Sequence, residues 1–183
     1  MAMTPVWSEN GVLARARQVF SPNQDARPAG MTVDMLVIHN ISLPPGHFGG
    51  PSIERLFTNR IRGDAHLSIS ALSSLRVSAH FLIRRGGTIL QFVACDRRAW
   101  HAGTSEWNGR HRCNDFSIGI ELEGTDTVPY TPQQYRRLFR LTKDICERYP
   151  ISVVVGHSDI APGRKTDPGP AFAWDTYRVM LER

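Results

Sequence analysis

The sequence lacks the features that mark membrane-spanning, secreted and disulfide-stabilised proteins. Its 183 residues contain no apolar run that approaches the roughly 20 residues of a membrane span, and none near the start with the length that a secretory signal needs. Cysteine is scarce: Cys95, Cys113 and Cys146 are far apart and form no CxxC pair, which argues against a disulfide framework and a thiolate zinc cluster. We therefore expect a cytoplasmic protein with reduced thiols.

A long stretch of one charge is also missing. The formal net charge is +5, but the arginines are scattered in separate pairs and triplets along the chain. Proteins that bind nucleic acids usually gather basic residues on one continuous face. We therefore expect no nucleic acid and no membrane as partner, and nothing in the sequence indicates an obligate protein partner.

What is present is the pattern of one domain over residues 1–183, which is long enough to bury a hydrophobic core. The clearest element is a helix at 131–149, in which Thr131 is a plausible N-cap and Gln134 completes a capping box. Pro150 ends this helix. Weaker helical patterns occupy residues 9–19, 52–60 and 173–182.

Strands are predicted from short apolar or alternating runs at 33–40, 116–124 and 151–155. Residues 79–94 contain two further strand-like runs around a Gly86-Gly87 turn, which predicts a hairpin. Hairpin strands pair antiparallel, whereas strands joined by helices favour parallel pairing. The combination predicts an α/β fold with a mixed central β-sheet flanked by helices.

Polar side chains lie at the ends of two of the predicted strands. His39 comes after MLVI and His157 after VVVG, and the ends of neighbouring strands meet along one edge of a sheet. A hydrolytic zinc site needs three neutral or anionic protein ligands, usually histidines and a carboxylate, and an open fourth position for water. Asp167, in a loop stiffened by prolines, is the favoured third ligand, whereas Asp159 could instead cap a turn. Two hydrogen-bonded structural histidines remain the alternative, because no local motif such as HExxH is present.

Glu121 lies inside the strand predicted at 116–124. A buried carboxylate without a partner costs several kcal/mol, so a glutamate on an inward face needs a neighbouring cation or a chemical use. Because side chains alternate along a strand, Glu121 and Glu123 share one face, which could also be the solvent side. His80 and His101, in apolar or glycine-flanked surroundings, either line the same cleft or are structural.

Five segments carry a family resemblance: LVIHNISLPPG at 36–46, VSAHFLI at 77–83, RAWHAGTS at 98–105, RCNDFSIGIELEGTD at 112–126 and GHSDIAPGRKTDPGP at 156–170. Together they closely resemble the AmpD-type 1,6-anhydro-N-acetylmuramoyl-L-alanine amidases. The resemblance implies the fold shared by N-acetylmuramoyl-L-alanine amidases and peptidoglycan recognition proteins. It also implies a cytoplasmic zinc amidase of peptidoglycan recycling, which cuts the amide between the lactyl group of anhydromuramic acid and the L-alanine of the stem peptide. In relatives, the anhydromuropeptide pool that such an enzyme consumes induces a β-lactamase.

By this resemblance the family's zinc ligands fall on His39, His157 and Asp167, with one zinc ion per chain, and its catalytic glutamate and lysine fall on Glu121 and Lys165. A non-catalytic recognition module would be expected to lack a ligand or the glutamate, and none is missing. A broad-range amidase acting on intact cell walls would need export, for which no signal is visible.

Substrate contacts are expected at four further positions. Arg76 and Arg164 are candidates for the carboxylates of a muropeptide, because a guanidinium matches a carboxylate with two parallel hydrogen bonds. The family's sugar and peptide contacts suggest Asn40 and Trp100. Ordinary surface charge and packing are the alternative for all four. The chain departs from its relatives around residues 64–75, so one wall of the cleft is expected to differ in shape.

Overall fold

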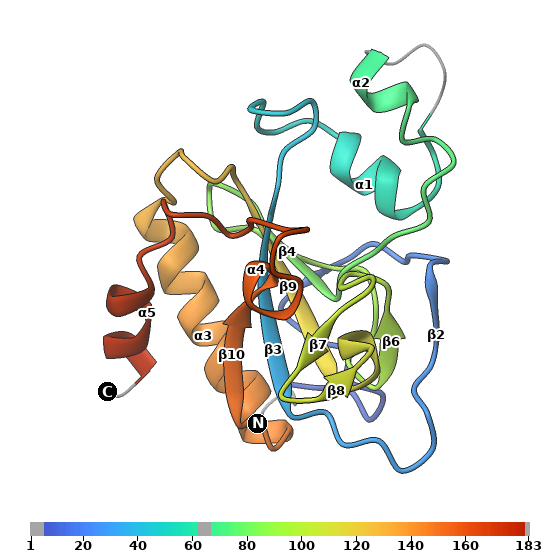
Figure 1. Ribbon diagram of the computed structural model, residues 1–183, viewed down its shortest axis with the longest axis vertical. Coiled ribbons are helices and arrows are strands. Elements are labelled where there is room, and N and C mark those ends of the chain that lie inside the picture. Colours follow the sequence, from blue (N-terminus) through green and yellow to red (C-terminus); the bar gives the residue numbers. More distant parts are fainter. Residues whose placement is uncertain (1–5, 62–66, 182–183) are drawn as a thin grey trace, which may run out of the picture.

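The computed structural model describes residues 6–61 and 67–181. Its centre is a six-stranded sheet in the order β1-β5-β4-β9-β3-β10 (Figure 1). In that order the strands are β1 (Arg17–Gln18), β5 (Ile89–Gln91), β4 (Phe81–Ile83), β9 (Ser117–Glu123), β3 (Met35–Ile41) and β10 (Val153–Gly156). All neighbours pair in parallel except β4 and β5, which form the predicted hairpin. The expected mixed sheet is confirmed.

Shorter elements surround this sheet. Two small antiparallel sheets join β2 (Gln24–Ala26) to β6 (Arg97–Ala99) and β7 (Glu106–Trp107) to β8 (Arg110–His111). The helical segments are α1 (Ser52–Phe57), α2 (Leu67–Ser70), the 3-10 helix η1 (Cys113–Asp115), α3 (Pro132–Arg148), α4 (His157–Ile160) and α5 (Trp174–Leu181). The helices predicted at 52–60 and 173–182 are therefore confirmed in shorter form. Part of the divergent stretch 64–75 lies outside the described residues.

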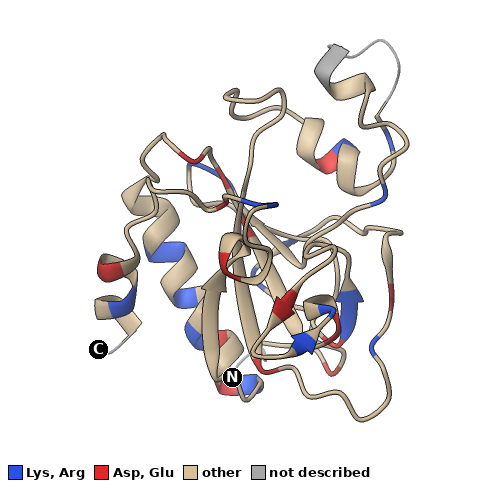
Figure 2. Cartoon of the chain, in the orientation of Figure 1, with Lys and Arg blue, Asp and Glu red and all other residues tan. Residues whose placement is uncertain are grey.

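The helices lie on one face of the sheet and beyond one end of its strands. Helices α3 and α5 cover one face, whereas α1 and α2 lie beyond the C-terminal end of β3 (Figure 1). Lys and Arg are spread over α3, α5, β6 and β8, with Asp and Glu among them (Figure 2). Within the described ranges, no helix has the length and apolar character needed to cross a membrane.

The longest helix begins as its sequence predicts. Thr131 Oγ1 accepts a hydrogen bond from the Gln134 N–H at 3.1 Å, and Gln134 Oε1 accepts one from the Thr131 N–H at 3.0 Å. This reciprocal pair is the capping box, and it satisfies two backbone donors that a helix start leaves free. Leu138 and Leu141 on the inner side of α3 are fully buried in the core cluster between this helix and the sheet.

Alternation along β9 decides which of its side chains face the helices. Ile118, Ile120 and Leu122 belong to the core cluster beneath α3, so Glu121 and Glu123 project from the opposite face. Both glutamates are buried, with exposed fractions of 8% and 2%. This excludes the solvent-facing alternative and brings two carboxylates into the interior of the protein.

The helix predicted at 9–19 is wrong. These residues form turns followed by β1, which pairs in parallel with β5 at the edge of the sheet. Gly11 has a φ of +76°, outside the helical region. The Gln91 side chain donates to the Gly11 carbonyl at 2.9 Å and accepts from the Leu13 N–H at 2.8 Å. Pairing with the edge of the sheet thus supplies the hydrogen bonds that a helix would have supplied.

Candidate active site

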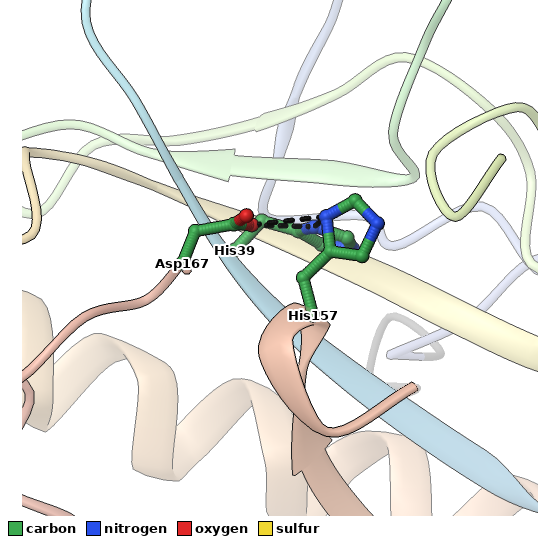
Figure 3. A group of neighbouring side chains, drawn as sticks. All are labelled: His39, His157 and Asp167. Carbon is green, nitrogen blue, oxygen red and sulfur yellow. Dashed lines mark hydrogen bonds and ion pairs between the residues drawn. The ribbon is translucent and has the colours of Figure 1, made fainter. Parts of the chain in front are cut away.

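Three polar side chains from separate segments meet near the C-terminal ends of the central strands (Figure 3). His39 lies on β3, His157 begins α4, and Asp167 lies in the loop after α4 with its carboxylate directed at the two imidazoles. The Nδ1 atoms of the two histidines are 3.0 Å apart, and each lies 3.1 Å from Asp167 Oδ2. The structure thus brings the three residues indicated by the sequence into a nearly equilateral triangle, which we call the His-His-Asp triangle.

Local packing holds Asp167 beside the start of α4. The Ser158 N–H donates to the Asp167 carbonyl at 2.9 Å, which fastens the loop to the helix. Pro168 packs against Gly156, where a Cβ would lie 2.8 Å from the proline Cδ. Asp159 accepts a hydrogen bond from the Gly156 N–H at 2.7 Å and so caps α4. The cap keeps Asp159 out of the triangle.

The outer nitrogens of the two histidines are also engaged. His39 Nε2 lies 2.9 Å from His101 Nδ1, and His157 Nε2 lies 3.0 Å from the Ala102 carbonyl oxygen. Because a carbonyl only accepts, His157 carries its proton on Nε2 and presents the Nδ1 lone pair to the triangle. Burial lowers the pKa of His39 to about 4 and lowers the pKa of His101 well below its usual value, so both rings are neutral at pH 7.

The triangle fits a zinc ion. In a tetrahedral site with bonds of about 2.0 to 2.2 Å, ligand atoms lie about 3.3 to 3.6 Å apart. The observed separations of 3.0 and 3.1 Å are close to that range. Three acceptor atoms at these distances repel one another unless a cation or a proton lies among them. Two imidazole nitrogens and one carboxylate oxygen are also a donor set of hydrolytic zinc sites, which leave a fourth position open.

Glu121 lies beside His39, because the two residues are partners in the register of β9 and β3. Its Oε2 atom is buried and has no hydrogen-bond partner within the described part of the chain. Burial raises the pKa of Glu121 well above its usual value, and the nearby Asp167 carboxylate adds to the rise. Glu123 differs, because its carboxylate accepts hydrogen bonds from the Arg84 guanidinium at 2.7 Å and from two backbone N–H groups.

Two hollows meet at this site. The triangle, Glu121 and Lys165 line a cavity of about 220 Å³, which also has an apolar lining that includes Trp100. A more polar hollow of about 620 Å³ is lined in part by Asn40 and Arg164. Lys165 and Asp167 line both. A substrate with an apolar part and a charged part could therefore span the two hollows and pass the triangle between them.

Of the four expected substrate contacts, one lies outside both linings. Asn40, Trp100 and Arg164 line a hollow, but the Arg76 side chain lines neither, and its guanidinium donates to the carbonyls of Ser73 and Leu75 at 2.9 and 3.2 Å.

The sequence did not decide whether His80 and His101 line the cleft, and the structure places them differently. His101 lines the smaller cavity. His80 packs behind it with ring centroids 5.7 Å apart, accepts a hydrogen bond from the Gly119 N–H at 3.0 Å, and lies 3.1 Å from the Arg97 carbonyl oxygen. His80 is therefore a structural histidine.

Asp126 is a site residue that the sequence did not indicate. The Asn40 side-chain amide donates to Asp126 Oδ1 at 2.8 Å and to the Pro168 carbonyl at 3.1 Å. These two bonds orient the Asn40 amide, so its Oδ1 atom is the group that remains to accept from a ligand. Asp126 is 86 residues from Asn40, and no local pattern could have paired them.

Comparisons with known proteins show which family the chain belongs to. The family model described as N-acetylmuramoyl-L-alanine amidase matches residues 29–170. The 1,6-anhydro-N-acetylmuramyl-L-alanine amidase AmpD of Escherichia coli K12 is 56% identical over 177 residues, which are 96% of this chain and 97% of that protein.

Solved structures show the same fold. The crystal structure of a selenomethionine derivative of AmpD matches with a TM-score of 0.92 at 55% identity, over 94% of this chain and 98% of that chain. The Escherichia coli amidase AmiD, in complex with the substrate anhydro-N-acetylmuramic acid-L-Ala-D-γ-Glu-L-Lys, matches with a TM-score of 0.60 at 31% identity, over 95% and 65% of the two chains. The expected amidase fold is confirmed. The chain belongs to the N-acetylmuramoyl-L-alanine amidase family.

Proposed function

We propose that this protein is a zinc amidase of peptidoglycan recycling, which hydrolyses the amide between 1,6-anhydro-N-acetylmuramic acid and the L-alanine of the stem peptide. The observation that carries the proposal is the convergence on one cavity of the His-His-Asp triangle and of Glu121, whose Oε2 atom has no hydrogen-bond partner among the described residues. The relatives support the choice of substrate, because AmpD is named for this bond and AmiD is described with an anhydromuramoyl peptide as its substrate.

His39, His157 and Asp167 are the proposed ligands of one zinc ion per chain. When bound, the ion supplies a Lewis acid that polarises a carbonyl group and lowers the pKa of water from about 16 to about 7. The three side chains line the same cavity, so an ion held by them would be accessible to water and substrate from that cavity.

Glu121 is the proposed general base and acid. Its carboxylate takes a proton from water as the water oxygen bonds to the lactyl carbonyl carbon, and then gives that proton to the alanine nitrogen as the C–N bond breaks. The products are a lactyl carboxylic acid and a stem peptide with a free amino group. Burial raises the pKa of Glu121, which makes the carboxylate a stronger base toward the water proton.

Lys165 is proposed to stabilise the oxygen of the scissile carbonyl as it becomes negative. Its side chain lines both hollows beside Asp167, so an ammonium group is available near the point where they meet. Charge or hydrogen-bond donors directed at such an oxygen typically contribute about 10²- to 10³-fold in rate.

The two hollows suggest how the substrate lies. We place the anhydro sugar in the smaller cavity, where Trp100 offers a flat apolar surface, and the stem peptide in the larger polar hollow beside Asn40 and Arg164. The Nη2 atom of Arg164 already donates to the carbonyls of Ala102 and Thr104, so its remaining N–H groups are the proposed donors to the peptide. The scissile amide then lies where the hollows meet, beside Lys165 and Asp167.

Three further expectations stay predictions. We propose that residues 1–183 act as one catalytic domain, because elements of a single sheet and its adjoining loops position all three proposed ligands. We propose a cytoplasmic location, which cell fractionation tests. Arg76 is proposed as a carboxylate contact, for which its guanidinium would have to leave the carbonyls of Ser73 and Leu75.

The decisive experiment is a mass-spectrometric assay of the purified protein on an anhydromuropeptide and, in parallel, on an ordinary muramoyl peptide. We expect zinc-dependent release of the intact stem peptide from the anhydro form, loss of activity after chelation, and recovery when zinc is returned. Binding without cleavage in the presence of stoichiometric zinc would favour a recognition module. Equal cleavage of both substrates would remove the proposed selectivity.

A further inference from the structure

The hydrogen bonds behind His39 continue beyond His101. His101 Nε2 lies 3.2 Å from Ser117 Oγ, and Ser117 Oγ lies 2.6 Å from the Cys113 carbonyl oxygen. The groups come from β3, the loop after β6, η1 and the first residue of β9. His39 and Ser117 are buried, with exposed fractions of 1% and 0%. An uninterrupted series of hydrogen bonds therefore links the triangle to a backbone carbonyl.

The direction of this series is determined at its far end. A carbonyl oxygen only accepts, so the Ser117 hydroxyl donates to Cys113, and this is the shortest link of the series. The Ser117 oxygen then accepts from His101, which places the His101 proton on Nε2. His101 Nδ1 consequently accepts from the Nε2–H of His39. The proton of neutral His39 is therefore on Nε2, and the lone pair on its Nδ1 atom is directed into the triangle.

We propose that His101 and Ser117 are positioning residues, which select the tautomer and ring orientation of His39 and so strengthen its binding of the metal ion. The proposal rests on the proposed function only in taking His39 as a zinc ligand. His157 reaches the Ala102 carbonyl directly at 3.0 Å and needs no such series. Loss of an outer hydrogen bond to a ligating histidine typically lowers metal affinity about 10- to 100-fold.

The surroundings of His101 are shaped to hold its ring. Gly119 leaves the space that the imidazole occupies, since a Cβ at this position would lie 2.5 Å from His101 Cγ. The Asn114 side-chain oxygen accepts hydrogen bonds from the backbone N–H groups of His101 and Ala102, at 3.0 and 2.8 Å. The Asn114 side chain thus positions both His101, which contacts His39, and Ala102, whose carbonyl accepts a hydrogen bond from His157.

Ser78 provides a matched control for Ser117. It is buried with an exposed fraction of 1%, and it lies outside the series, although it contacts the residue before His101: its hydroxyl donates to the Asn23 carbonyl at 2.6 Å and accepts from the Trp100 backbone N–H at 3.0 Å. We expect Ser117→Ala to raise the zinc dissociation constant about 10-fold or more, and Ser78→Ala to leave it unchanged, although each variant loses the two hydrogen bonds of a buried hydroxyl group. The dissociation constants are measured by competition with a chromogenic chelator, and folding is checked by thermal unfolding.

A pair of His101 variants keeps the test decisive if Ser117→Ala folds poorly. Asn carries its side-chain oxygen near the position of the imidazole Nδ1, so His101→Asn should retain an acceptor for His39, whereas His101→Leu should not. We expect zinc affinity to be at least about 10-fold higher for the Asn variant than for the Leu variant. Equal affinities of these two folded proteins would overturn the proposal, as would equal affinities of the Ser117 and Ser78 variants.

A spectroscopic measurement separates this proposal from the proposed function. In zinc-free wild-type protein at pH 8, the ¹⁵N chemical shifts of His39 are expected to show the proton on Nε2. A proton on Nδ1 would overturn the direction of the series. Absence of zinc binding by the wild-type protein would count against the proposed function, and the tautomer of His39 would still decide the present inference.

Discussion

Replacing Glu121 by glutamine removes a buried charge that the nearby Lys165 offsets only in part. Its Oε2 atom is buried without a hydrogen-bond partner among the described residues. Leaving a buried polar atom unsatisfied costs about 1 to 3 kcal/mol, and more for a charged group. Glutamine keeps a polar atom at this position and removes only the additional cost of the charge, so the free energy of unfolding should rise by about 1 kcal/mol or more at pH 8. For a protein of this size, each kcal/mol raises the Tm by about 2 to 4 °C.

The gain in stability should depend on pH. Burial raises the pKa of Glu121, so between the unfolded pKa of about 4.3 and the higher folded value, the folded state holds a proton that the unfolded state has released. Wild-type stability therefore falls as the pH rises through this interval. Glutamine does not titrate, so the difference in Tm between the variant and the wild type should be smallest near pH 4 and larger at pH 8. Calorimetry should use zinc-free protein, so that the positive charge of a bound ion does not alter the difference in Tm between the variant and the wild type.

Glu123 is the matched control, because it lies on the same face of β9 and is also buried. Its carboxylate pairs with Arg84 at 2.7 Å, and removing one partner of a buried ion pair costs about 3 to 5 kcal/mol. Glu123→Gln should therefore lower the Tm, opposite to the change expected for Glu121→Gln.

The two glutamate variants should differ in activity as well. Loss of a general base lowers kcat about 10²- to 10⁴-fold, so Glu121→Gln should have this effect with its zinc content unchanged, whereas Glu123→Gln should retain most turnover per folded molecule. A Glu121→Gln protein that is less stable than the wild type at pH 8 would refute the view that burying this charge costs more than its neighbours return. Full turnover in that variant would remove Glu121 from the mechanism.

Other substitutions test the remaining assignments. Asp167→Ala should lower the zinc content, whereas Asp159→Ala should keep the zinc and lose about 1 kcal/mol of stability, because α4 loses its cap. Atomic emission measures the zinc content and thermal unfolding measures the stability. Loss of zinc in the Asp159 variant and not in the Asp167 variant would make Asp159 the ligand. Lys165→Met should lower kcat about 10²-fold with little change in KM in steady-state assays; an effect confined to KM would make Lys165 a binding residue only. Gly119→Ala should lower the Tm, because a Cβ there would lie 2.5 Å from the His101 ring; an unchanged Tm would show that this ring moves freely.

Local chemistry made several features readable from the sequence. The capping box of Thr131 and Gln134 uses atoms three residues apart, so its pattern alone locates the start of α3. The alternation in β9 likewise predicts that Glu121 and Glu123 share one face. His39 and His157 follow short apolar runs in the sequence, and the resemblance to known amidases indicated both as ligands. All these inferences depend on neighbours in sequence or on long matching motifs.

Other features depend on groups that meet only after folding. Residues 9–19 have helical spacing, but part of this segment bonds to β5 instead. The residues of β5 lie more than 70 positions further along the chain. Whether Glu121 faces solvent, and whether Asp159 or Asp167 joins the histidines, depends on which surfaces cover β9 and how the loop after α4 folds back. The series from His39 through His101 and Ser117 has no signature in the chain, because hydrogen bonds between side chains are set by distance and direction in space. The sequence thus determined the elements and the chemical groups, and the tertiary structure decided which of those groups are buried, paired or left free to react.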